Sequence, residues 1–214
     1  MSAEAIPVAR AATLVADLVR VIVANKAYLS EIDGAIGDGD HGINMAKGFA
    51  AAGRKLTALP PLRAALSTLG ETLMEDVGGS MGPLYGQFFI SMAETVGEAV
   101  EVNARLFGAM LGAAQTAIQE LGSAKLGDKT LLDTLIPARA AYDEALAAGK
   151  PFAACLERMV TAAEQGRDST RDMVARVGRA SRLGERSRGV LDAGAASCFL
   201  ILSTMATSLR ASLG

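Results

Sequence analysis

The sequence contains no tryptophan, and aromatic residues make up only 4% of its 214 residues. Sheet proteins draw heavily on aromatic and β-branched side chains, so this shortage argues against a fold based on sheets. Alanine, leucine, glycine and methionine are abundant instead, and this mixture favours closely packed helices. Half of the residues are hydrophobic, which is enough for a sizeable core. We therefore expect a single all-helical domain that covers residues 1–214.

A strong charge of either sign is also missing, because the formal net charge is −2. General attraction to nucleic acid or to a membrane surface is therefore not expected. The N-terminus shows no basic segment followed by a continuous apolar run, which argues against a secretory signal. Serine and threonine interrupt the apolar run at 193–209, so we interpret it as a buried helix. Cys155 and Cys198 lie outside any C-x-x-C pattern, as is typical of reduced thiols in a cytoplasmic protein.

Apolar residues recur with helical spacing along the chain, and no segment shows a convincing strand pattern. Glycine, proline and aspartate separate about eight helices. The expected helices cover roughly residues 7–30, 43–56, 61–77, 83–97, 103–122, 130–148, 151–177 and 192–209. Helices joined by short connections alternate in direction, so every second loop emerges at the same end of a bundle.

The alternate loops form two sets with different compositions. The first set is rich in glycine, aspartate, serine, lysine and arginine and comprises residues 31–42, 78–82, 122–130 and 178–192. The second set is short, has little recurrent chemistry and lies near residues 57–60, 98–102 and 149–150. Turn chemistry alone does not explain why the unusual loops share one end. We therefore predict a binding site at that end, which we call the rim.

The segment DGAIGDGDHGINMAKGF, at 33–49, places Asp33, Asp38 and Asp40 among glycines and then changes to helical spacing. Neighbouring carboxylates repel one another unless a cation lies between them, and hard oxygen ligands suit Mg²⁺ or Ca²⁺. The N–H groups that begin the next helix favour an anion such as phosphate. An ordinary turn with an N-cap is the alternative, whereas the EF-hand spacing is not present. His41, the only histidine, is either solvated or in contact with phosphate.

The other rim loops offer further contacts, each with a simpler alternative. The GGSMG segment at 78–82 can present N–H groups to phosphate or can merely end a helix. Gly122 and Leu131 can form a slot for a flat base or an ordinary junction. Arg179 and Asp192 can contact phosphate and ribose, or they can be a solvated arginine and an N-cap. Outside the rim no spare histidine or polar cluster is available for a second substrate, so another chain is expected to supply the acceptor.

Four segments resemble the signature segments of a known family: IGDGDHGINMAKGF, GGSMGPLYGQFF, GDKTLLDTLIPA and GRASRLGERSRGVLDAGA. They are similar to those of the ADP-binding L subunit of bacterial dihydroxyacetone kinases. The same unit occurs as the nucleotide domain of single-chain ATP-dependent ketose kinases. The resemblance covers nearly the whole chain in the same order, and it implies a barrel of eight antiparallel helices with the nucleotide capping one rim.

The resemblance also implies cofactors and site residues, position by position. Asp33, Asp38 and Asp40 would hold two Mg²⁺ on the phosphates of ADP or ATP. The implied nucleotide contacts are His41, Gly42, Ile43, Asn44, Ser80, Met81, Gly122, Leu131, Arg179, Leu191, Asp192 and Ala193. No catalytic side chain is implied in this chain itself.

The implied partners follow from the same resemblance. In the phosphotransferase-dependent members of the family, ADP stays bound, and a phosphohistidine protein of the sugar phosphotransferase system recharges it to ATP. The γ-phosphoryl group then passes to dihydroxyacetone, which is held covalently on a histidine of the separate K subunit. The sequence leaves open whether the chain forms a homodimer.

Four positions depart from the family pattern. Met81 replaces a usual serine, Val190 a histidine and Ala193 a proline, and Arg182 stands where an aromatic residue is common. These departures concern nucleotide binding and the surface that faces partner proteins.

Three functions fit the sequence. The first is the nucleotide subunit of a dihydroxyacetone-type kinase, and the second is the same unit of an ATP-dependent kinase for another small sugar such as erythrulose. The third is a non-catalytic helical sensor that binds a nucleotide or an apolar ligand.

Overall fold

A computed structural model describes residues 4–56, 58 and 60–213. Residues 1–3 of the N-terminus and residues 57 and 59 of the expected 57–60 connection lie outside the described residues. The α-helices are α1 (Val8–Ala11), α2 (Thr13–Ala24), α3 (Lys26–Ile36), α4 (His41–Lys55), α5 (Leu62–Asp76), α6 (Met81–Val96), α7 (Ala104–Leu121), α8 (Leu132–Ala147), α9 (Phe152–Ser169) and α10 (Ala193–Leu213). The other elements are the 3₁₀-helices η1 (Thr170–Asp172) and η2 (Arg179–Ser187) and the strands β1 (Ala5–Pro7) and β2 (Glu101–Asn103).

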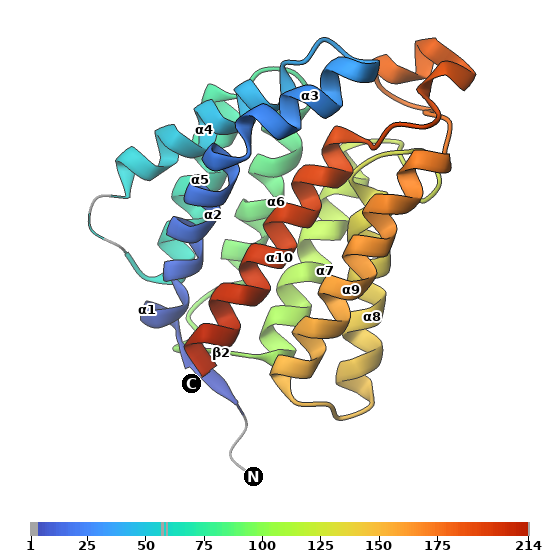
Figure 1. The fold of residues 1–214 in the computed structure, drawn as a ribbon. Helices are drawn as coiled ribbons and strands as arrows, with labels where there is room; N and C mark the ends of the chain where they lie inside the picture. The colour runs from blue at the N-terminus through green and yellow to red at the C-terminus, as the bar shows by residue number, and fades with distance from the viewer. Residues whose placement is uncertain (1–3, 57, 59, 214) are drawn as a thin grey trace.

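The all-helical prediction is confirmed, and the long helices close into a ring (Figure 1). In ring order, α2 contacts α4, which is followed by α5, α6, α7, α8, α9 and α10, and α10 closes the ring on α2. The described residues form ten α-helices rather than eight. The expected helix at 7–30 is divided near Ala12 and at Asn25, where the Asn25 side chain donates to the carbonyl of Val21 and competes with the backbone.

The interior of the ring is filled by large side chains. Phe49, Phe88 and Phe89 are fully buried and meet edge to face, with ring centroids 5.0 Å apart for Phe88 and Phe89 and 6.0 Å apart for Phe49 and Phe89. Cys155 and Cys198 are buried, unbridged thiols, as predicted.

The expectation of no strand is wrong at one place. β1 and β2 form a two-stranded antiparallel pair in which Ala5 lies opposite Asn103. Each strand has only three residues, which is too short for an alternating pattern to be visible in the sequence. Asn103 caps α7, because its side chain accepts from the backbone N–H of Leu106 at 3.0 Å.

The rim lies at the end of the ring where α4, α6, α8 and α10 begin and where α3 crosses it (Figure 1). Its loops are shorter or more structured than the sequence suggests. The expected loop at 31–42 shrinks to residues 37–40, because α3 continues to Ile36. α6 begins at Met81, two residues before Pro83, and a proline is tolerated there because the first turn needs no internal N–H donor.

The last two helices also differ from their expected limits. α9 ends at Ser169, before the expected end near 177, and η1 follows it. Within the expected loop at 178–192 the chain forms η2, which bends at Gly184, where φ is 54°. These 3₁₀ segments project beside the rim in Figure 1.

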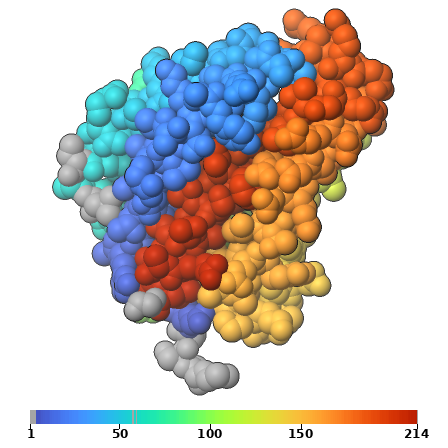
Figure 2. All heavy atoms as spheres, viewed as in Figure 1, coloured from blue at the N-terminus to red at the C-terminus, as the bar shows by residue number. Residues whose placement is uncertain are grey.

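α10 is the one helix of the described residues that is long and apolar enough to cross a membrane by composition. Within this fold, however, 56% of its apolar window is buried. It packs against α2, α8 and α9, and Figure 2 shows part of it at the surface between α2 and α9. This burial supports its interpretation as a packed helix of the ring.

Candidate functional site

Three aspartates converge at the point where α3 passes into α4. Asp33 lies in the last turn of α3, and Asp38 and Asp40 lie in the four-residue loop that follows. One carboxylate oxygen from each can be chosen so that all three lie within 4.8 Å of one another. Gly37 makes this approach possible, because a Cβ there would lie 2.5 Å from Oδ1 of Asp33. The predicted juxtaposition of the three carboxylates is therefore present.

The donor set of this cluster fits a hard divalent cation. All three groups are carboxylates at least partly open to solvent, and a small oxygen-rich cluster is what Mg²⁺ and Ca²⁺ prefer. Arg179, which lies at the start of η2, forms an ion pair with Asp38 and supplies one positive charge to the cluster. The structure thus joins the first and last rim loops through two residues that the sequence had singled out.

Four helix N-termini open onto the same rim. α4 begins at His41, α6 at Met81, α8 at Leu132 and α10 at Ala193. Each helix start presents backbone N–H groups without an internal partner and the positive end of a helix dipole. Together with a carboxylate-bound cation they form an environment for a polyanion such as a nucleotide phosphate chain.

The His41 ring does not face the rim. It is buried, and its Nε2 lies 2.9 Å from Oγ of Ser197, which in turn lies 2.7 Å from the hydroxyl of Tyr85. Burial lowers the pKa of His41 to about 4, although Asp33 opposes this shift. The ring is therefore neutral, and through Ser197 and Tyr85 it connects α4 with α10 and α6. A contact between phosphate and this turn would then be made by backbone N–H groups and not by the imidazole. The backbone N–H of His41 itself donates to Oδ2 of Asp33 at 3.3 Å.

Leu131 and Asp192, which come from different loops, lie next to each other. A Cβ placed on Gly194 would be 2.9 Å from Oδ2 of Asp192 and 3.4 Å from the backbone nitrogen of Leu131. Asp192 caps α10, since its Oδ2 accepts from the N–H of Ala195 at 2.7 Å. The capping alternative is thus confirmed. Because Asp192 also lies beside Leu131, this cap is compatible with a contact between Asp192 and a ribose.

Burial raises the pKa of Asp192 to about 7. The nearby carboxylates of Asp133 and Asp33 add to this rise, whereas the Ala195 N–H and the Lys129 ammonium oppose it. A carboxyl group that titrates near neutrality in a rim of acidic groups indicates a site where added positive charge is favourable.

The remaining implied nucleotide residues lie at the edges of the same rim. Ser80, Ile43 and Gly122 are exposed, Asn44 is half-buried, and Gly42, Leu191 and Ala193 are buried. Met81 is half-buried and packs against the core. Gly122 ends α7 and begins the loop that reaches Leu131.

The loop at 122–131 is built by polar residues that the sequence analysis did not select. Asp133 accepts from the backbone N–H groups of Gly127 at 2.6 Å and Thr130 at 2.7 Å. Lys129 is 2% exposed and donates to three backbone carbonyls of other segments. A lysine in a polar loop gives no sequence signal of burial, although both residues fall within the GDKTLLDTLIPA segment.

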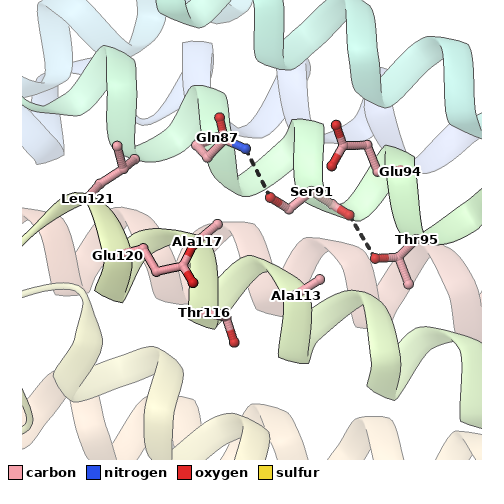
Figure 3. Close-up of a pocket in the computed structure, with 9 residues that line it drawn as sticks. All are labelled: Gln87, Ser91, Glu94, Thr95, Ala113, Thr116, Ala117, Glu120 and Leu121. Carbon is pink, nitrogen blue, oxygen red and sulfur yellow. Dashed lines mark hydrogen bonds between the residues drawn. The ribbon is translucent and has the colours of Figure 1, made fainter.

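A separate groove runs between α6 and α7 (Figure 3). Gln87 and Thr95 of α6 both bond to Ser91, and the facing wall is formed by α7. Its charged residues, Glu94 and Glu120, are both acidic, and none of the predicted site residues lines it. The candidate site is therefore the rim.

Comparison with known proteins shows the family of the chain. The DAK2 domain family matches residues 35–207. The chain is 35% identical over 198 residues to the ADP-binding subunit DhaL of PEP-dependent dihydroxyacetone kinase 2 from Listeria innocua, covering 91% of each protein. It is 32% identical to L-erythrulose kinase from Pectobacterium atrosepticum, over 89% of this chain and 33% of that enzyme.

Two crystal structures of the dihydroxyacetone kinase of C. freundii share the fold. The native form gives a TM-score of 0.69 at 24% identity, and the complex with AMP-PNP and Mg²⁺ gives 0.63 at 25% identity. Each comparison covers 92% of this chain, which spans about a third of the length of those kinases, 34% and 33% respectively.

The fold, the rim and these relatives show that the chain belongs to the phosphotransferases, as a subunit of a kinase. More particularly, the chain belongs to the DAK2 domain family and, within it, to the ADP-binding DhaL subunits of dihydroxyacetone kinases.

Proposed function

We propose that this chain is the nucleotide-holding subunit of a dihydroxyacetone-type kinase and passes a γ-phosphoryl group to dihydroxyacetone on a separate K subunit. The observation that carries the proposal is the cluster of Asp33, Asp38 and Asp40, with ligand atoms within 4.8 Å, at a rim where four helices begin. Such a rim can hold ADP or ATP through cations and backbone N–H groups. The DhaL relatives are named as ADP-binding subunits, which supports the nucleotide.

Each group of the rim has a separate task in this proposal. The three aspartates hold two Mg²⁺, which would neutralise the phosphate charge during in-line transfer. The helix starts at His41 and Met81 direct N–H groups toward the phosphates, and Arg179 adds a positive charge. No side chain of this chain is assigned as a general base, because the sole histidine is buried against Ser197.

The first test is Asp38→Asn. Removing one carboxylate charge weakens the metal site, so we expect phosphoryl transfer in a system reconstituted with a K subunit to fall by roughly 100-fold or more, with the fold retained. Asp17→Asn is the matched control, because Asp17 pairs with Arg20 on the surface of α2. Unchanged transfer by Asp38→Asn would favour the non-catalytic sensor.

An ATP-dependent kinase for another small sugar is the second candidate. It is favoured by the similarity to an L-erythrulose kinase, which carries this unit within a longer chain. The two candidates differ in how they keep nucleotide. Protein purified in Mg²⁺ and then denatured should release near-stoichiometric ADP if the subunit is a permanently loaded relay, whereas an exchanging kinase should be isolated empty and bind Mg-ATP reversibly.

The proposed partners and location follow from the same role. The acceptor sugar would be carried by a substrate-binding K subunit, and a phosphohistidine protein of the phosphotransferase system would recharge ADP. The names of the PEP-dependent and PTS-dependent relatives support such a donor. We place the protein in the cytoplasm, where these partners act. A homodimer, which the sequence left open, forms no part of the proposal.

A further inference from the structure

Lys129 occupies an unusual position for a lysine. Its residue surface is 2% exposed, and its backbone has φ of 63°, which makes it the one described residue other than glycine with a positive φ. The left-handed conformation is unfavourable for a residue with a side chain. A lysine held in this conformation and removed from water must make contacts that offset both costs.

Those contacts are three hydrogen bonds from one ammonium group. Nζ donates to the carbonyl oxygens of Thr170 at 2.6 Å, Met173 at 3.3 Å and Val190 at 2.6 Å. An ammonium group has three N–H donors, so its capacity is fully used. Lys129 therefore has no donor left for a phosphate and does not act as a ligand.

The three carbonyls belong to the segments between α9 and α10, which lead to Leu191 and Asp192 at the rim. Thr170 and Met173 follow α9, and Val190 precedes Leu191 and Asp192. Two further bonds reinforce the junction: the N–H of Asp192 donates to Oγ1 of Thr170 at 3.0 Å, and the N–H of Arg176 donates to the carbonyl of Asp128 at 3.1 Å. These hydrogen bonds connect the loop that ends at Leu131 with the segment that begins α10.

We propose that Lys129 is a positioning residue that holds the Leu131 and Asp192 segments at a fixed separation and so preforms the half of the site that receives the nucleoside. This inference rests on the proposed nucleotide function. The carboxylate cluster lies on α3 and the loop before α4, which Lys129 does not contact. Lys129 should therefore govern binding of the nucleoside part of Mg-ADP and leave binding of metal and phosphate largely unaffected.

The test compares two probes on Lys129→Met by titration calorimetry. Mg-ADP needs both halves of the rim, whereas Mg-pyrophosphate needs only the metal and phosphate half. We expect Kd for Mg-ADP to rise at least tenfold and Kd for Mg-pyrophosphate to change less than threefold. Lys129→Arg, which keeps a cation with several donors, should recover part of the lost Mg-ADP affinity. Lys125→Met is the matched control, because Lys125 is exposed in the same loop.

Each other outcome overturns either the positioning role of Lys129 or the proposed nucleotide function on which it rests. Equal loss of both probes, or of neither, would show that Lys129 does not act on the nucleoside half. If Lys129→Met does not fold, Lys129→Gln replaces it, and failure of both to fold would reduce Lys129 to a structural residue. Wild-type protein that binds no Mg-ADP would instead refute the proposed function.

Discussion

Asp192 shows how the rim alters the chemistry of one side chain. Burial and the neighbouring Asp133 and Asp33 raise its pKa to about 7, against 3.8 for an unperturbed aspartate. The folded state therefore holds a proton that the unfolded chain releases. The resulting contribution to the free energy of unfolding is fully present below about pH 4 and is lost as pH rises through about 7.

We predict that this loss is visible in the metal-free protein. Between pH 5 and pH 8 the contribution of Asp192 should fall by roughly 2–3 kcal/mol. Asp192→Asn keeps an acceptor for the N–H of Ala195 but cannot ionise, so it should lack this component. The measurement is urea unfolding in EDTA at both pH values. A stability difference between wild type and variant that does not change with pH would contradict the assignment.

The sequence predicted single residues well where their chemistry is local. The three aspartates converge as predicted, and Asp192 caps its helix, which is one of the two roles expected for it. The inward His41 ring and the buried Lys129 were not predictable, because both depend on partners far away in the sequence, Ser197 and the carbonyls after α9. A buried polar side chain is recognised only when its acceptors are known.

At the scale of elements, the contact of α3 with α4 fixes the geometry of the carboxylate cluster. α4 approaches α3 at Gly42, where a Cβ would lie 2.1 Å from the carbonyl oxygen of Lys26 and 2.7 Å from the backbone nitrogen of Ser30. Backbone atoms cannot yield to this clash as a flexible side chain would. Only glycine therefore allows this helix start to lie so close to the first half of α3.

This packing predicts opposite effects for two glycine substitutions. Gly42→Ala should destabilise the fold by roughly 1–3 kcal/mol and weaken Mg²⁺ binding, because α4 must move. Gly34→Ala, in α3, has its nearest neighbour at 3.8 Å and should be neutral or stabilise by about 0.5–1 kcal/mol. Thermal unfolding and Mg²⁺ titration of both variants test this pair. The reverse order of stabilities would show that the interface is looser than described.

The helices were easier to predict than their ends. Apolar periodicity located every helix of the ring, because a helix that packs on one face carries that pattern along its length. The break at Asn25 carries no glycine or proline signal. α3 continues to Ile36 through Gly34, a residue type that in the sequence suggests a loop. The early start of α6 depends on tertiary contacts around Gly82, where a Cβ would lie 2.2 Å from the carbonyl oxygen of Val77.

At the scale of the whole molecule, the rim brings together segments from both ends of the chain, including Asp38 and Arg179. The alternation of helix directions was sufficient to predict this gathering from the sequence. It could not predict that α3 would lie outside the ring and close over the rim, since that depends on how α3 packs against α4 and α10.

A ligand that binds across these segments should stabilise the entire fold. Mg-ADP at a hundred times its Kd is expected to add about 2.7 kcal/mol to the free energy of unfolding. EDTA should remove this gain, because the phosphates are held through the metal ions. The check is thermal unfolding with Mg-ADP, with ADP and EDTA, and without additions. An identical midpoint in all three would count against a nucleotide site.

The pairing of β1 with β2, and the contact of β1 with α10, places the two ends of the described chain together at the end opposite the rim (Figure 1). The turn between α8 and α9, which contains Gly149, lies at that end as well. A circular permutant that joins the present ends by a short linker and opens at this turn would alter no residue of the rim. The order in which the helices are connected is thus separable from the geometry that holds the ligand.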